Sequence, residues 1–173
     1  LCAAKPGARL LAGGTDVALW VNKQFRKLGE IIYLGEVAEL KTIEQAPGWL
    51  TIGAGASLQA AWAALARHWP DSREMGLRFA SLPVREVGTM GGNIANGSPI
   101  GDSMPLLVAL NARVVLARAQ GGAIATRELA LEDLYTGYRT NCMAADELLA
   151  WVEVPAPQPG AWMRAYKISK RQE

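Results

Sequence analysis

The amino-acid sequence predicts an α+β protein built as two lobes, and three observations support this. Short apolar runs with strand character are mixed with segments of helical periodicity. Two stretches alternate apolar and polar residues on both sides of a glycine-containing turn, as antiparallel hairpins do. Half of the 173 residues are apolar, which is enough for a core in one domain or in two small lobes that share an interface.

The smaller lobe is expected over residues 1–55, as a mixed sheet with a helix across it. Two short apolar segments, residues 8–14 and 31–34, have strand character, and the first is expected to be buried. Residues 40–55 alternate apolar and polar side chains around Pro47 and Gly48, which predicts a hairpin in this same lobe.

The helix of the smaller lobe is expected between its first two strands. Thr15 or Asp16 is positioned as the N-cap, and Gly29 as the glycine that ends the helix. The apolar side chains on one helical face are Val17, Trp20, Val21, Phe25 and Leu28. This face is expected to pack on the sheet.

The larger lobe is expected over residues 56–173 and begins with helices. Ser57 is positioned to cap the first of them, and a second helical stretch covers about residues 72–81. After a glycine-rich run, a further helix is expected to begin at Asp102 or Ser103.

The rest of the larger lobe is expected to be mainly antiparallel sheet. Residues 113–129 give a hairpin pattern that turns through glycines, and residues 129–138 a short helix and turn. Residues 147–155 and 162–173 have strand patterns. The last strand runs to the end of the chain without a cap or turn, so we expect a domain cut from a longer polypeptide or a fragment of a subunit.

Charge and composition exclude several classes of partner. The 18 basic and 16 acidic residues are spread along the chain and leave a net charge of +2. A nucleic-acid protein needs a basic stripe to neutralise phosphates, and none is present. The N-terminal residues lack the layout of a signal peptide and the length of a membrane span. We therefore expect a soluble, cytoplasmic protein without nucleic-acid or membrane partners.

The inventory of reactive residues excludes most hydrolytic and metal chemistry. Cys2 and Cys142 are the only cysteines and have no C-x-x-C spacing, so they predict no disulfide framework, zinc site or iron–sulfur site. His68, the only histidine, ends a helical pattern, where a cation favours the last carbonyl groups. We predict no catalytic acid–base residue and no metal ligand in this chain.

Two glycine-rich segments are the candidates for a binding site. The first glycine segment is LLAGGTDV (residues 10–17), and the second is GTMGGNIANGSPIGD (residues 88–102). Each places adjacent glycines beside small polar residues near the start of a helix, where main-chain N–H groups form an anion site. The hydroxyls of Thr15 and Thr89 add donors. Brought together at the lobe interface, the two segments would hold a diphosphate from two sides.

Neither segment matches a common phosphate fingerprint. Leu58 stands where a G-x-G-x-x-G match beginning at Gly53 needs its last glycine, and Ser98 stands where a P-loop needs lysine. Gly13 and Gly14 are equally consistent with a simple strand-to-helix turn. The second glycine segment is expected to be a long loop, and such loops inside compact domains are usually functional or disordered. Its interleaved apolar residues argue against disorder.

These segments resemble the FAD-binding domain of molybdenum hydroxylases, most closely the xanthine dehydrogenase type. The resemblance rests on LLAGGTDV and VGTMGGNIANGSPIGDSMPLLVALNA and continues in ELLAWVEVP and AYKISKRQE. It covers nearly the whole chain in the right order. The combination of T-x-G-G-N-I with S-P-I-x-D is specific.

The resemblance implies a fold and an activity. The fold is the two-lobed FAD-binding domain of the vanillyl-alcohol-oxidase and molybdopterin dehydrogenase type, with FAD in the cleft between the lobes. The chain would be a partial oxidoreductase of purine catabolism that passes electrons from iron–sulfur clusters through FAD to NAD⁺. The iron–sulfur clusters and the molybdenum cofactor would belong to partner domains or subunits that this chain lacks.

The resemblance also implies site residues. The first diphosphate loop is Leu10, Leu11, Ala12, Gly13, Gly14, Thr15, Asp16 and Val17, and the second is Thr89, Met90, Gly91, Gly92 and Asn93, both acting through main-chain N–H groups. Phe79 would lie beside the isoalloxazine, Asp102 and Leu148 would contact FAD, and Lys167 would lie near the flavin end. From the residues alone, these four are equally a core phenylalanine, a helix N-cap, a strand-core leucine and a solvated lysine.

Two other functions stay open. The chain is alternatively the flavin domain of another molybdenum hydroxylase, of the carbon monoxide, nicotinate or aromatic acyl-CoA type, whose electron acceptor need not be NAD⁺. It is otherwise a non-catalytic nucleotide-binding assembly module that kept the fold and lost the cofactor. The S-P-I-x-D stretch favours the xanthine dehydrogenase type.

Overall fold

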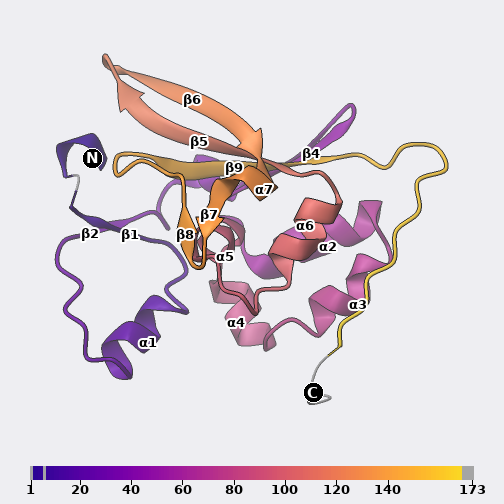
Figure 1. The fold of residues 1–173 in the computed structure, drawn as a ribbon, viewed down its shortest axis with the longest axis horizontal. Coiled ribbons are helices and arrows are strands. Elements are labelled where there is room, and N and C mark those ends of the chain that lie inside the picture. The colour runs from indigo at the N-terminus through magenta and orange to yellow at the C-terminus, as the bar shows by residue number, and fades with distance from the viewer. Residues whose placement is uncertain (1, 6, 169–173) are drawn as a thin grey trace.

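The structure is a computed structural model that describes residues 2–5 and 7–168 (Figure 1). Its α-helices are α1 (Val17–Asn22), α2 (Leu58–His68), α3 (Ser72–Leu77), α4 (Leu82–Val87), α5 (Met90–Asn96), α6 (Ser103–Ala109) and α7 (Leu131–Leu134). Its strands are β1 (Arg9–Leu11), β2 (Ile31–Tyr33), β3 (Ile43–Ala46), β4 (Trp49–Gly53), β5 (Arg113–Gln120), β6 (Ala123–Ala130), β7 (Tyr135–Gly137), β8 (Thr140–Asn141) and β9 (Leu148–Pro155). Short 3₁₀ turns cover Cys2–Ala4 and Ala38–Lys41. This mixture confirms the predicted α+β class.

A five-stranded antiparallel sheet organises most of the chain. Its strand order is β3-β4-β9-β5-β6, so the late strand β9 lies at the centre. Helices α2 to α6 lie on one side of this sheet (Figure 1). Fully buried side chains of the three central strands, such as Ile52, Val114 and Val152, form one core with Leu65 of α2 and Leu107 of α6. Apolar burial between sheet and helices supplies the main stabilisation of this part.

Both predicted hairpins are confirmed. In the β5–β6 hairpin, Gln120 pairs with Ala123, and Gly121 and Gly122 make the two-residue turn with φ of +61° and +83°. Positive φ at both positions is what a tight hairpin turn requires, and glycine adopts it without steric cost. The β3–β4 hairpin turns at Gly48, whose φ is +85°.

The β3–β4 hairpin belongs to a different sheet from the one predicted. Strands β1 and β2 form a separate two-stranded parallel sheet, whereas β4 pairs with β9 along its whole length. The prediction that residues 40–55 belong to the small sheet is therefore wrong, because local alternation does not identify a distant partner strand. Strand β1 is also half-exposed rather than buried. The lobe boundary at residue 55 stays a prediction, and sheet membership favours an earlier position.

The first helix is much shorter than predicted. Helix α1 ends at Asn22, and Phe25, with φ of +53°, is 86% exposed. Gly29 therefore does not end this helix, and Phe25 does not share its face. No residue of α1 is buried. A short helix without a packed face lacks the tertiary contacts that sustain helices, which explains the early end.

The helices of the larger lobe follow the prediction more closely. Ser57 caps α2, where its Oγ accepts the N–H of Ala60 at 3.1 Å. The stretch 72–81 is helical only to Leu77, and α4 follows after Ala80, whose φ is +51°. Among residues 162–168 no strand forms, although burial alternates there; residues 169–173, the rest of that predicted strand, lie outside the described residues.

Candidate cofactor-binding cleft

A cleft of about 530 Å³ lies beside the segment that joins β1 to α1. Its volume is in the range of small-molecule sites, about 300–1,000 Å³. Residues 9–17 form one wall, and residues 88–96 and 143–149 contribute to the others. Both glycine segments therefore line the same cleft, as the diphosphate hypothesis requires.

The first glycine segment offers unpaired main-chain donors. Leu10 and Leu11 belong to β1, α1 begins at Val17, and residues 12–16 turn between them, with Gly14 at φ of +72°. Within the described part of the chain, the N–H groups of residues 12–17 donate to no protein atom. Such donors need water or a ligand as acceptor. These N–H groups are therefore available to water or to a bound anion.

The second glycine segment is not the predicted loop, because most of its first half is helix α5. Thr89 is the N-cap, and its Oγ1 accepts the N–H of Gly92 at 3.1 Å. Gly97 ends the helix in the left-handed conformation, with φ of +57°. An N-cap followed by a C-terminal glycine is the sequence signature of a short helix. The glycine content obscured that signature.

The N–H groups of the second segment are already used within the protein. Met90 donates to the carbonyl of Ala56 at 2.9 Å, and Gly91 to that of Ala54 at 2.8 Å. Asn93 donates to Thr89 O at 3.0 Å. Gly92 donates to Thr89 Oγ1, so the prediction that these residues act through free main-chain N–H groups is wrong for Met90, Gly91, Gly92 and Asn93. Their membership of an FAD site stays a prediction.

Two of the glycines are required by close main-chain packing. A Cβ on Gly13 would lie 2.1 Å from Val87 O, and one on Gly91 would lie 2.3 Å from the Cβ of Ala54. Gly92 differs, because a Cβ there would meet the Thr89 hydroxyl at 2.8 Å rather than the main chain of another element. Gly92 is exposed in the cleft wall, so a larger side chain at this position would extend toward the cleft or displace the Thr89 cap.

Contacts join the two glycine segments directly. A Cβ on Gly13 would lie 2.8 Å from Gly88 Cα, and Asn96 Nδ2 donates to Asp16 Oδ2 at 3.1 Å. Asp16 stands at the N-cap position of α1 but makes no side-chain capping bond. Its carboxylate instead links α1 to α5 across residues far apart in the sequence.

Of three other predicted site residues, two line the cleft and one does not. Leu148 begins β9, lines the cleft and packs with Leu34 and Leu40 against the sheet. Met90 is fully buried in the core and does not line the cleft. Asn93 lines it, and its Oδ1 is buried without a partner in the described residues. A buried unpaired acceptor calls for a donor that the protein does not supply.

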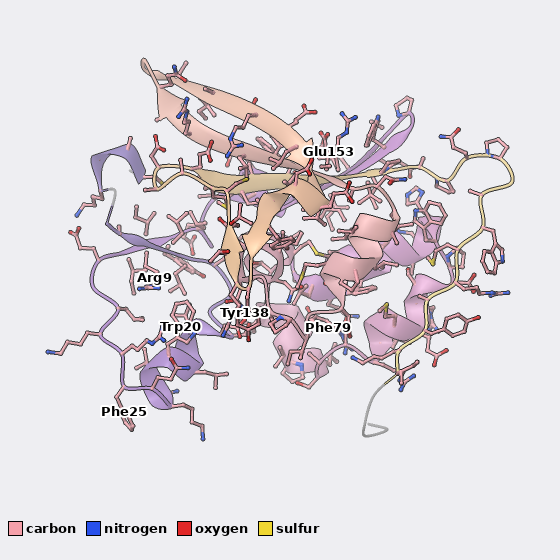
Figure 2. All side chains as sticks on the ribbon, in the orientation of Figure 1. Arg9, Trp20, Phe25, Phe79, Tyr138 and Glu153 are labelled. Carbon is pink, nitrogen blue, oxygen red and sulfur yellow. The ribbon has the colours of Figure 1, made fainter. Side chains whose placement is uncertain are left out.

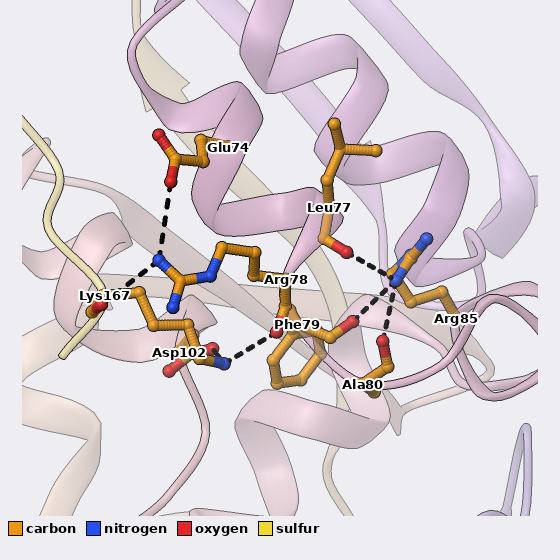
Figure 3. Close-up of polar contacts among 8 residues, drawn as sticks. All are labelled: Glu74, Leu77, Arg78, Phe79, Ala80, Arg85, Asp102 and Lys167. Carbon is orange, nitrogen blue, oxygen red and sulfur yellow. Dashed lines mark hydrogen bonds and ion pairs between the residues drawn. The ribbon is translucent and has the colours of Figure 1, made fainter. Parts of the chain in front are cut away.

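Phe79, Asp102 and Lys167 come together, but outside the residues that line the cleft (Figure 3). Lys167 Nζ lies 2.5 Å from Asp102 Oδ2, donates to Arg78 O at 2.9 Å and stands 5.8 Å from the centre of the Phe79 ring. The side chain of Lys167 is only 21% exposed, so the solvated-lysine alternative is wrong. Asp102 occupies the N-cap position of α6 but makes no side-chain capping bond.

Arg85 fixes the turn that carries Phe79, a role that sequence reasoning missed. Its Nη1 donates to the carbonyls of Leu77, Phe79 and Ala80 at 3.2, 2.9 and 2.8 Å (Figure 3). Its Nε donates to Gln59 Oε1 at 2.8 Å, and the residue is buried. A planar guanidinium satisfies several carbonyls at once, which a lysine could not do in the same geometry.

The cleft wall carries arginines and a tryptophan that the sequence did not reveal as site residues. Arg9, Arg26 and Arg139 line the cleft, and Asp16 is the only acidic residue among the described lining residues. This balance favours a polyanionic ligand. Figure 2 shows Arg9 beside Trp20, well away from Phe79. Trp20 was predicted on a packed helical face but is half-exposed here.

An ion pair between the buried carboxylate of Glu147 and the partly exposed Arg127 supports the wall around Leu148. Glu147 accepts from Arg127 Nε at 2.7 Å, from Arg127 Nη2 at 2.8 Å and from the N–H of Ala144 at 2.8 Å. Chiefly through the hydrogen bonds from Arg127, the pKa of Glu147 falls from its usual 4.5 to about 2. The pair also raises the pKa of Arg127 above its ordinary value.

Tyr135 holds the C-terminal end of α5. Its hydroxyl donates to Ile94 O at 2.9 Å, and burial raises its pKa to about 12. In the described residues no group of three or more His, Cys, Asp or Glu side chains is arranged to hold a metal ion. Over the same residues, no helix has the length and apolarity that a membrane crossing demands.

Comparisons with known proteins show the family and the fold of this chain. The family described as "FAD binding domain in molybdopterin dehydrogenase" matches residues 1–157. The xanthine dehydrogenase of Emericella nidulans is 29% identical over 97% of this chain, which spans 13% of that protein. The nicotinate dehydrogenase FAD-subunit of Eubacterium barkeri is 28% identical over 94% of the chain, which spans 55% of that subunit. A structure of carbon monoxide dehydrogenase from Hydrogenophaga pseudoflava superposes with a TM-score of 0.82 and 27% identity, covering 96% of this chain and 57% of its own.

Proposed function

Because the chain belongs to the family of FAD-binding domains in molybdopterin dehydrogenases, we propose that its cleft binds FAD, with the diphosphate at residues 12–17. The observation that carries this assignment is the run of unpaired N–H groups at those residues, which line a cleft whose charged side chains are three arginines and one aspartate. Main-chain donors at a turn into a helix are well suited to phosphate oxygens.

The other walls of the cleft also suit this cofactor. Asn93 Oδ1 offers a buried unpaired acceptor, and Gly92 presents main chain without a side chain. Leu34, Leu40 and Leu148 form an apolar surface that suits the less polar part of an isoalloxazine. The protein's contribution is to bind and orient the cofactor, since the redox chemistry belongs to the flavin.

We propose that the chain is one part of a xanthine-dehydrogenase-like oxidoreductase. Electrons would reach FAD from iron–sulfur clusters and leave to NAD⁺, and the partners would be an iron–sulfur domain and a molybdenum-cofactor subunit. The similarity to xanthine dehydrogenases along nearly the whole chain supports this reading. The same proposal includes a cytoplasmic location and a role in purine catabolism. The free thiols of Cys2 and Cys142 are typical of a reducing compartment.

A second candidate is the flavin domain of another molybdenum hydroxylase, with an acceptor other than NAD⁺. The similarity to a nicotinate dehydrogenase FAD-subunit and the superposition on carbon monoxide dehydrogenase favour it. Reduction of bound flavin by NADH separates the candidates, since it is expected only where NAD⁺ is the acceptor.

The test of FAD binding is an absorption spectrum of the full chain followed by titration with FAD. We expect saturable binding that Gly92→Val weakens at least tenfold, because a branched side chain would fill the ligand side of α5. Gly7→Val is the matched control, since nothing lies within 4 Å of a Cβ there. A folded protein without affinity for FAD would overturn the proposal and favour the non-catalytic assembly module.

A further inference from the structure

Trp20 is the only aromatic side chain among the described residues that line the cleft. It belongs to α1, a helix that buries none of its residues, so core packing does not explain a tryptophan at this position. Its ring is instead held by two arginines. The Cζ atoms of Arg9 and Arg26 lie 5.0 and 5.6 Å from the ring centre, within cation–π range.

The three residues come from different segments that the fold brings together. Arg9 begins β1, and Arg26 follows α1 and donates its N–H to the carbonyl of Trp20 at 3.0 Å. Figure 2 shows Arg9 above Trp20 on the β1–α1 side of the molecule. Neither guanidinium is paired with a carboxylate in the described part of the chain. The indole ring and two arginines without carboxylate partners in the described residues thus line the cleft together.

An indole face flanked by guanidinium planes matches the chemistry of a nucleobase joined to phosphate. Aromatic and arginine side chains stack on bases, and the cations attract the neighbouring phosphate. The leucines near Leu148 form an apolar surface away from these arginines in the sequence, and this surface suits the isoalloxazine better. The two ends of the dinucleotide would then lie on different parts of the cleft wall.

We propose that Trp20, supported by Arg9 and Arg26, binds the adenosine end of the dinucleotide. This inference rests on the proposed function, since it assigns one end of the same ligand. It makes FAD the preferred flavin over FMN, because FMN lacks the adenosine that this site would hold.

The experiment compares the binding of FAD, ADP and FMN to the full chain and to Trp20→Ala. Loss of one base-stacking contact is expected to weaken the binding of FAD and of ADP about tenfold. The affinity for FMN should stay unchanged. Trp162→Ala is the matched control, because Trp162 also lies near an arginine, Arg164 at 5.9 Å, but does not line the cleft.

Further variants keep the test decisive if Trp20→Ala destabilises the chain. Trp20→Phe should remove a component of tryptophan emission that FAD and ADP quench, and Arg26→Gln should weaken ADP severalfold while Arg164→Gln does not. Equal weakening of FMN and FAD, or no change for any ligand, would overturn the adenosine assignment alone. If the unmodified chain binds neither FAD nor ADP, the proposed function fails first.

Discussion

The two glycine segments resemble each other in composition but differ in what their main chains do. In the first, the N–H groups of residues 12–17 have no protein acceptor in the described structure. In the second, Met90, Gly91, Gly92 and Asn93 all donate to protein atoms. Glycine content alone therefore does not identify a phosphate loop. The decisive property is whether the main-chain donors remain unpaired.

The glycines themselves serve different purposes in the two segments. Gly14 provides a left-handed turn next to the unpaired donors, whereas Gly91 allows α5 to approach the end of β4. Because α5 packs against the core, substitutions there are expected to act on stability. Apart from Gly13, which packs against Val87, and Gly14, whose φ is +72°, substitutions in the first segment are expected to act mainly on the ligand.

Gly91→Ala is expected to lower the free energy of unfolding more than any other substitution considered below. Its new Cβ would lie 2.3 Å from the Cβ of Ala54 and 2.8 Å from main-chain atoms of that residue, so α5 or β4 must shift. Overpacking of this kind costs about 1–3 kcal/mol of unfolding free energy. Urea unfolding measures it. Gly92→Ala is the control and should cost less, and equal costs at the two positions would contradict the packing difference.

Glu147→Gln is expected to have an intermediate effect on the free energy of unfolding. Glu147 lies next to Leu148 of the cleft wall. The substitution removes the charge that Arg127 and the N–H of Ala144 stabilise, at a cost of about 1–3 kcal/mol. The control is Glu128→Gln, because the Glu128 side chain is 55% exposed and lies 3.7 Å from its partner Arg113. Similar losses for both variants would show that burial adds nothing to the Glu147 pair.

The effect of Glu147→Gln on the free energy of unfolding is expected to depend on pH. The pKa of Glu147 is lowered to about 2 in the folded protein, so its stabilisation is complete above about pH 4.5 and is lost as the pH falls towards 2. The difference in unfolding free energy between the unmodified chain and Glu147→Gln should shrink across this window. A difference that stays constant from pH 5 to about pH 2 would refute the shift.

The smallest expected effect is that of Thr89→Ala, which removes the N-cap of α5. Loss of such a cap costs about 1 kcal/mol, and Thr89→Ser should retain most of the stability because it keeps the hydroxyl. Thermal unfolding of the three proteins measures this. A Thr89→Ala protein as stable as the unmodified chain would mean that the cap of the second segment does not contribute.

Local patterns predicted much of the fold. The turn at Gly121 and Gly122, the cap at Ser57 and the strand at 148–155 depend on neighbours in the sequence, and the structure has all three. The helical nature of the second segment was also encoded locally, in Thr89 and Gly97, but its glycines favoured a loop interpretation. The length of α1 was overestimated because an apolar face was assumed to have a core to pack on.

The sequence by itself determined which main-chain stretches lack side chains, which turns are tight and which residues cap helices, because these depend on steric and hydrogen-bonding preferences within a few residues. Only the tertiary structure decided that β4 pairs with β9, that Lys167 meets Asp102, and that Arg9 and Arg26 flank Trp20. Such contacts depend on how distant segments bury apolar surface together, and sequence spacing carries no record of that distance.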